Sequence, residues 1–529
     1  MKAGPAFTPL RPREAMNMTL MRDVVLRVHR EHPNLTAKHR YAILTYIPEL
    51  AEVVGPVPQT LTDIASWDER TRFQDGITRR AAHGIAELLD TYTRLAGPLT
   101  LTVDPTDQEL RAILHRRARL VTVRIGPPAP PEEPTEEVIR NHISRGAFET
   151  AALLAKTANK HRLHAFSVRR TDPELAEEIL LELQENHTDP DTLMATNYSL
   201  AMLYAAFHEP ARRDLQRAKA FAQKAVELAD GLGHPFARSF QRNGLALVEL
   251  RSGNADAALE LTTECVRIME TELPDSAREH HAVLHINRAR VLQTLGLLEE
   301  ARQDFDTAIA CDPYFPEYHY YRAGCARLRG DDEAAIVGYE RAMELSAPWP
   351  EPYYSRGDIR AAQGDVQGAL EDFGYVLELD PDHLDARVNR AALLAESGAR
   401  EAAMADIEHG LRLAPGNAHL LCTKGLLEES EAARELFAQA LASDPTLTPA
   451  LVNSAILDYD DGDFAAAIEK LTRALETVPE DPDLWFNRGV ALQAAGRHDA
   501  AVADYRRALA LPGADRTELL GKLAELNAR

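Results

Sequence analysis

Two pairs of histidines have a spacing that could bind a metal ion. His281 and His285 stand four positions apart, and His161 and His164 stand three apart, so each pair would share one face of a helix. A zinc site needs three or four ligands, and no set of cysteines or carboxylates beside either pair completes one. We therefore expect these histidines to be structural, and we expect no metal and no other cofactor.

Patterns of catalysis and nucleotide binding are also missing from the sequence. The first 150 residues contain no phosphate-binding loop of the GxxxxGK(S/T) type. No Ser/His/Asp, Cys/His or paired-carboxylate constellation stands out elsewhere. The four cysteines form no CxxC pair and lie in apolar stretches, which favours reduced thiols. The sequence therefore predicts no catalytic residues and a protein that is not an enzyme.

The net charge of −23 is spread unevenly over the 529 residues. Residues 1–126 carry eighteen Lys and Arg against fourteen Asp and Glu, or +4, so the remainder carries −27. A surface this acidic argues against nucleic-acid binding, and no apolar run is long enough to span a membrane. No secretory signal follows Met1. We expect a cytoplasmic protein with a neutral or basic protein or peptide as partner, and binding to neither nucleic acid nor membrane.

A 34-residue repeat organises the second half of the chain. A glycine and an alanine five positions later recur together at Gly296/Ala301, Gly330/Ala335, Gly364/Ala369, Gly398/Ala403, Gly462/Ala467 and Gly496/Ala501. The gap from Gly398 to Gly462 is two periods less four, because the repeat near 418–447 is shortened and its turn glycine is among the residues that are missing. Prolines follow on the same period at Pro381, Pro415, Pro445 and Pro479. Glycine ends one helix, the small alanine lets a second helix pack closely, and proline ends the pair.

These markers, with an aromatic or apolar residue in each second helix, resemble the tetratricopeptide repeat. The resemblance covers about residues 280–515 and implies a mostly α fold, a right-handed α-α superhelix preceded by a small α/β segment. It also implies a concave groove, lined by the first helix of each pair, that holds a protein or peptide. The expected divisions are 1–126 α/β, 127–134 proline-rich linker, 135–235 irregular helix pairs, 236–279 a long pair, 280–515 seven repeats and 516–529 a closing helix.

One position in each first helix is rich in asparagine. Two residues before the small packing residue, the repeats read Asn287, Tyr321, Ser355, Asn389, Thr423, Asn453 and Asn487. A primary amide both donates and accepts, so it can pair with a peptide backbone whatever its side chains. In tetratricopeptide proteins that bind extended peptides, asparagine here faces the groove. The alternative is that asparagine simply suits a solvated helix face.

The next position is mostly basic, and sixteen residues later an aspartate usually follows. Every repeat with the aspartate has the arginine, whereas the repeat that carries Lys470 also replaces the arginine by Ser454. This co-occurrence predicts an Arg–Asp pair that joins the two helices of a repeat, so most of these arginines would not be free for a ligand. Aromatic residues gather nearby, and we expect Tyr320, Tyr321 and Tyr354 on the groove side as partner contacts.

The amino-terminal segment has a different pattern. Residues 98–126 read as strand, turn, helix and strand, with Asp104 at the end of the first strand. This order resembles the middle of signal-transduction NTPases of the STAND type, reduced to a remnant because the phosphate-binding loop is missing and Pro105 follows Asp104. The leading interpretation is a scaffold, and family context suggests an accessory role in a bacterial biosynthetic or regulatory pathway. The alternatives are a regulator derived from a sensor NTPase, acting on an intact relative, and a repeat-containing transferase.

Overall fold

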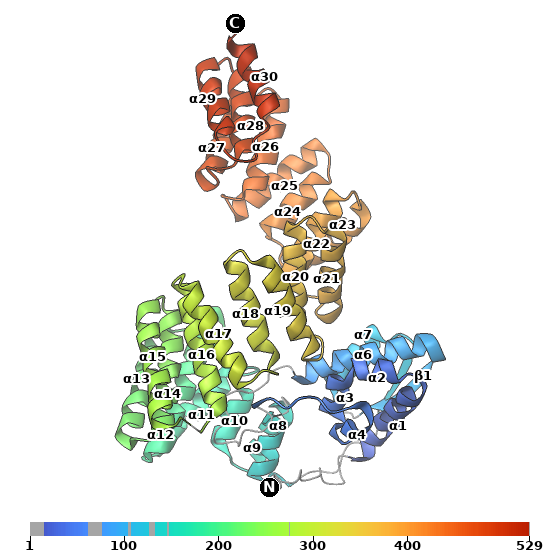
Figure 1. Cartoon of the computed structure of the whole chain (residues 1–529), viewed down its shortest axis with the longest axis vertical. Coiled ribbons are helices and arrows are strands. Elements are labelled where there is room, and N and C mark those ends of the chain that lie inside the picture. The colour runs from blue at the N-terminus through green and yellow to red at the C-terminus, as the bar shows by residue number, and fades with distance from the viewer. Residues whose placement is uncertain are drawn as a thin grey trace. The chain divides into compact units, whose positions relative to one another are not determined.

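The computed structural model describes residues 15–61, 77–103, 107–125, 133–144, 148–274 and 276–527. The chain divides into two compact units, Met1–Pro352 and Tyr353–Arg529. The described residues form mainly helices in consecutive pairs, with one small sheet near the beginning (Figure 1). The prediction of a mostly α helix-pair solenoid with a small α/β segment is confirmed.

The first part of the Met1–Pro352 unit is a helical module that includes a two-stranded sheet. Its elements are α1 Ala15–Glu31, α2 Pro33–Lys38, α3 Arg40–Tyr46, a 3-10 turn Pro48–Leu50, α4 Ala51–Val54, α6 Ile77–Ala96, β1 Leu99–Val103, α7 Gln108–Arg117 and β2 Val121–Ile125. The strands are parallel, in register from Leu99 opposite Val121 to Val103 opposite Ile125. The predicted strand–helix–strand order is therefore confirmed, while Asp104 and Pro105 lie outside the described residues.

This amino-terminal module has its own hydrophobic core. Side chains from α1, α3, α6, α7 and both strands form one buried cluster, which includes Val25, Ile43, Ile85, Leu101 and Leu114. The apolar face of α6 lies against α3 and α7. The module is thus a folded body rather than an extension of the repeats.

Helix pairs without a regular period continue the chain. They are α8 Glu136–Ser144, α9 Phe148–Thr157, α10 His161–Val168, α11 Pro173–Asn186, α12 Pro190–Met202, a π-helix Leu203–Phe207, a 3-10 turn Pro210–Arg212, α13 Leu215–Leu232, α14 Pro235–Arg251 and α15 Ala255–Glu272. Most of the expected proline-rich linker, residues 127–132, lies outside the described residues.

Regular pairs of helices follow. In the Met1–Pro352 unit they are α16 Arg278–Thr294, α17 Leu298–Cys311, α18 Pro316–Leu328 and α19 Asp332–Glu344. Helix α20, Pro350–Ala362, spans the division between the units. The Tyr353–Arg529 unit continues with α21 Val366–Leu379, α22 Leu384–Glu396, α23 Arg400–Leu413, α24 Ala418–Leu426, α25 Ser430–Ser443, α26 Thr448–Asp460, α27 Phe464–Thr477, α28 Pro482–Ala494, α29 His498–Leu509 and α30 Arg516–Asn527.

The turn glycines adopt the backbone conformation that the sequence pattern predicts. All six have φ between 73° and 82°, a region that residues with a Cβ rarely adopt. In three repeats an aspartate follows the glycine and caps the second helix, its carboxylate accepting from a backbone N–H three residues on at 3.0 Å; these are Asp331, Asp365 and Asp463. The four marker prolines each lie two residues beyond a second helix. The shortened repeat has a first helix, α24, of only 9 residues.

Close packing between the helices of a pair explains the small residue in each first helix. A Cβ added to Gly489 in α28 would lie 2.6 Å from Cε1 of Tyr505, whose ring is fully buried in α29. We expect Gly489→Ala to lower the free energy of unfolding by about 1–3 kcal/mol, the usual cost of overpacking a core. Urea denaturation followed by circular dichroism measures this change.

Gly374 in α21 provides a matched control. A Cβ there would meet only Nη1 of Arg390, at an ordinary contact distance of 3.6 Å. Alanine also favours the helix over glycine by up to about 1 kcal/mol. Gly374→Ala should therefore leave stability unchanged or slightly raised. Equal losses in the two variants would mean that close packing is not what requires glycine at position 489.

Candidate binding surface

Bidentate ion pairs join the two helices of four repeats. Nε and Nη2 of the arginine each donate to one carboxylate oxygen at 2.7–3.0 Å, in the pairs Arg288–Asp304, Arg356–Asp372, Arg390–Asp406 and Arg488–Asp504. The four aspartates are buried, with 3–5% of their surface exposed. The predicted Arg–Asp bracing is confirmed in these repeats.

Two of the three repeats without this pair use other partners. Arg322 in α18 has no aspartate sixteen residues later and instead contacts Asp306 of α17 at 2.7 Å. In the repeat with Ser454 and Lys470, the charges have changed places. Asp458 lies in the first helix and pairs with Lys470 in the second. The same aspartate accepts from Arg434 of the preceding repeat at 2.6 Å.

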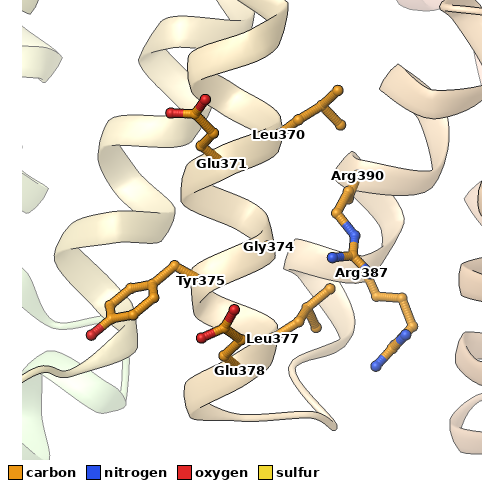
Figure 2. Close-up of a pocket in the computed structure, with 8 residues that line it drawn as sticks. All are labelled: Leu370, Glu371, Gly374, Tyr375, Leu377, Glu378, Arg387 and Arg390. Carbon is orange, nitrogen blue, oxygen red and sulfur yellow. The ribbon is translucent and has the colours of Figure 1, made fainter. Parts of the chain in front are cut away.

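An open hollow lies between α21 and α22, next to the Arg390–Asp406 pair (Figure 2). Glu371, Tyr375 and Glu378 line it from α21, and Arg387 and Arg390 line it from α22. Both arginines donate to Asp406. Burial lowers the pKa of the Arg387 guanidinium, and Asp406 opposes that shift. Because both arginines already donate to Asp406, they are not available to bind an anion in the hollow.

The asparagine position forms a polar cluster where α20 and α22 lie together. The amide nitrogen of Asn389 makes two long hydrogen bonds of 3.4 Å, one to the Tyr354 hydroxyl and one to Oδ1 of Asp358. The Tyr354 ring also stacks on His383, with 5.2 Å between centroids. Two of the predicted site residues, Tyr354 and Asn389, are thus brought together. Sequence reasoning missed Asp358, whose signal was its place one helical turn after Tyr354.

We call the side of the first helices that bears the asparagine position the recognition face. On this face of the Tyr353–Arg529 unit, Asn453 is half-buried and its amide donates to the Pro449 carbonyl of its own helix at 2.7 Å. Its amide oxygen keeps its acceptor capacity. Asn487 is half-buried in α28. The structure places Asn389, Asn453 and Asn487 on separate first helices and shows no contact among them.

The remaining predicted residues lie in the Met1–Pro352 unit. Asn287 in α16 donates from Nδ2 to the side-chain oxygen of Asn243 in α14 at 3.0 Å, so the amide series continues into a helix that precedes the predicted repeats. Tyr320 and Tyr321 are half-buried, with ring centroids 5.6 Å apart. Tyr320 also lies against Trp349, with centroids 5.2 Å apart.

The histidines that suggested a metal have separate partners. A ring nitrogen of His281 lies 3.1 Å from the Leu273 carbonyl, and one of His285 lies 2.8 Å from Asp304. Within the described residues, no group of three or more His, Cys, Asp or Glu is placed to hold a metal ion. No helix in the described part of the chain is both long and apolar enough to cross a bilayer.

Family models match the repeat region. Residues 286–350 and 452–515 match one model described as a tetratricopeptide repeat, and residues 360–424 match a second with the same description. The chain therefore carries tetratricopeptide repeats, as its sequence pattern indicates. A comparison with curated proteins found no match. The NTPase interpretation of the amino-terminal module gains no support and stays a prediction.

Several solved structures are similar to parts of this chain. A tetratricopeptide repeat protein from Parabacteroides merdae is 17% identical and aligns over 47% of this chain and 99% of its own, with a TM-score of 0.40. YrrB, described as a TPR protein with an unusual peptide-binding site, is 22% identical over 36% of this chain and 97% of its own, with a TM-score of 0.30. Yeast Tom70 is 15% identical over 74% of this chain and 94% of its own, with a TM-score of 0.37.

Proposed function

We propose that the chain is a non-catalytic scaffold whose recognition face holds a protein or peptide segment. The observation that carries this proposal is the cluster of Asn389, Tyr354 and Asp358 on neighbouring first helices. An amide, a hydroxyl and a carboxylate can together satisfy both the N–H and the C=O groups of an extended backbone. The two hydrogen bonds that the Asn389 amide donates here are long, at 3.4 Å, so the amide loses little when it turns to a ligand.

Charge favours a neutral or basic partner. Residues 353–529 contain seventeen Lys and Arg against thirty-one Asp and Glu, a net charge of −14. Several of the arginines near the recognition face already neutralise buried aspartates. The remaining field is negative, so it attracts a basic segment and repels an acidic one.

Exposed apolar side chains add a second kind of contact. Leu426 is 54% exposed and Ile456 is 48% exposed, so much of each apolar side chain faces solvent. Each lies three residues after the asparagine position of its helix, Thr423 in α24 and Asn453 in α26, and therefore on the recognition face. A partner with apolar side chains between basic ones would bury both.

Removal of the amides should test this function. We expect the triple variant Asn389→Ala, Asn453→Ala, Asn487→Ala to lose at least ten-fold in affinity for the partner, because three backbone-pairing groups disappear together. Affinity capture from the native host identifies partners of the wild type. Titration of each purified partner against both proteins then measures the loss.

Matched amides on second helices provide the control. Gln367 in α21 and Gln439 in α25 each pair with a glutamate four residues away on their own helix. The double variant Gln367→Ala, Gln439→Ala should retain full affinity. If the triple variant binds as tightly as the wild type, the amides of the recognition face are not the contact, and if the wild type captures no partner, the scaffold function itself is wrong.

A further inference from the structure

The amino-terminal module lies against the repeats of its own unit. The backbone N–H of Leu61 donates to Oδ2 of Asp312, just after α17, at 3.0 Å. A Cβ on Gly84 of α6 would lie 3.5 Å from Cδ of Pro348. Ala347, in the segment between α19 and α20, packs on the core of the module. Helix α6 and the segment before α20 thus approach at van der Waals distance.

At the centre of this contact, an arginine from α6 is held by two groups of the repeats. Nη1 of Arg80 donates to Oε1 of Glu317 at 2.8 Å. Its guanidinium carbon lies 4.2 Å from the ring centroid of Trp349. Both side chains of the ion pair are largely covered, with 22% and 18% exposed. A carboxylate beside an aromatic face is well suited to a guanidinium, which is planar and stacks as well as donates.

This arginine of α6 lies against the recognition face of α18. Glu317 is four residues before Tyr321, which occupies the asparagine position of α18, so the two share one side of that helix. Trp349, which lies before α20, contacts Tyr320, and Tyr320 is on α18 together with Glu317. The tyrosines that the sequence marked as partner contacts therefore stand beside a position that the chain's own α6 already fills.

Arg80 leaves two polar atoms of its site without a hydrogen bond. Oε2 of Glu317 and Nε1 of Trp349 are buried and have no hydrogen-bond partner among the described residues. A buried polar group without a hydrogen-bond partner is unfavourable relative to a bonded one. A peptide arginine could donate to both oxygens of Glu317 with a bidentate fork, and a carbonyl of the same peptide could accept from the indole N–H. A ligand of this kind would make bonds that Arg80 leaves unmade.

We propose that Glu317 and Trp349 form a binding site for an arginine-containing peptide, and that Arg80 of the amino-terminal module fills this site until a partner displaces it. The module is then a competitor within the chain, and binding at this position requires Arg80 to leave. The inference goes beyond the proposed function, because its site is distinct from the asparagines of the Tyr353–Arg529 unit.

The present occupant supplies the probe. A fluorescein-labelled octapeptide with the sequence of residues 77–84, ITRRAAHG, contains Arg80, and the matched peptide ITRAAAHG replaces only that residue by alanine. Fluorescence anisotropy with the full chain should show that an Arg80→Ala variant binds the first peptide at least ten-fold more tightly than the wild type does. The alanine peptide should bind the variant at least ten-fold more weakly than the arginine peptide.

Further variants separate the site from general effects. Glu317→Gln in the Arg80→Ala background should abolish the preference for the arginine peptide. The Arg80→Lys chain should bind the arginine peptide with an affinity between those of the wild type and of the Arg80→Ala chain. Lysine keeps the charge of Arg80 but loses its planar guanidinium, so it competes less well for the site. Circular dichroism verifies that each variant is folded. The inference is overturned if the Arg80→Ala chain binds both peptides alike or neither, or if Glu317→Gln changes nothing. The triple asparagine variant should bind the octapeptide like its parent, so either proposal can fail without the other.

Discussion

Replacing Asp406 by alanine should destabilise the Tyr353–Arg529 unit by about 3–5 kcal/mol, the usual cost of removing one partner from a buried charge network. Asp406 is 3% exposed and accepts from both Arg387 and Arg390. Without it, two guanidiniums remain in a largely covered place with no carboxylate between them. Urea denaturation followed by circular dichroism provides the measurement.

Two further variants test whether the loss of stability comes from the buried charge network. Asp382 carries the same charge, but its side chain is 70% exposed and its contact with His409 is 3.3 Å long, so Asp382→Ala should change stability by at most about 0.5 kcal/mol. Arg390→Ala should cost less than Asp406→Ala, because Arg387 still neutralises the aspartate. It should also reduce stability more than partner binding. The opposite order of the two losses would contradict a bracing role.

Mild acid should destabilise the Met1–Pro352 unit through buried histidines. Burial lowers the pKa of His39 to about 4, although Glu87 opposes the shift, and burial lowers the pKa of His83 and of His280 to about 3. An unfolded histidine titrates near about 6.5. Below that pH the unfolded chain binds more protons than the folded chain, so stability falls from about pH 6.5 down to the folded pKa values. At pH 5 the loss is about 2 kcal/mol for each histidine.

Hydrogen–deuterium exchange, corrected for intrinsic rates, measures this loss at pH 7.5 and 5.0 in the helices that contain His83 and His280 and in α2 and α3, which flank His39. A variant with His83 replaced by glutamine should show a smaller difference between the two pH values. Substitution of the exposed His234 provides the control, because that side chain faces solvent in both states. If the His83 and His234 variants lose protection equally at pH 5.0, burial of the histidine is not the cause.

Periodic features of the fold could be predicted from the sequence, whereas contacts between distant segments could not. The turn glycines and the Arg–Asp braces recur at fixed intervals, so comparison of repeats within one chain reveals them. Asp358 stands one turn after Tyr354 but does not recur in the other repeats, and Asn243 precedes the regular repeats, so no periodic pattern marks either residue as an amide partner. Arg80 and Glu317 are 237 residues apart, and no local pattern in the sequence could join them.

The exchanged charges around Asp458 affect how the array can open. Braces such as Arg390–Asp406 lie within one helix pair, so they break only when that pair unfolds. Asp458 instead connects α26 both to Lys470 in α27 and to Arg434 in α25, the pair before it. Because repeat arrays unfold through nearest-neighbour couplings, α24–α27 should open as one cooperative block. Thermal fraying that begins at the carboxy terminus should pause at this block.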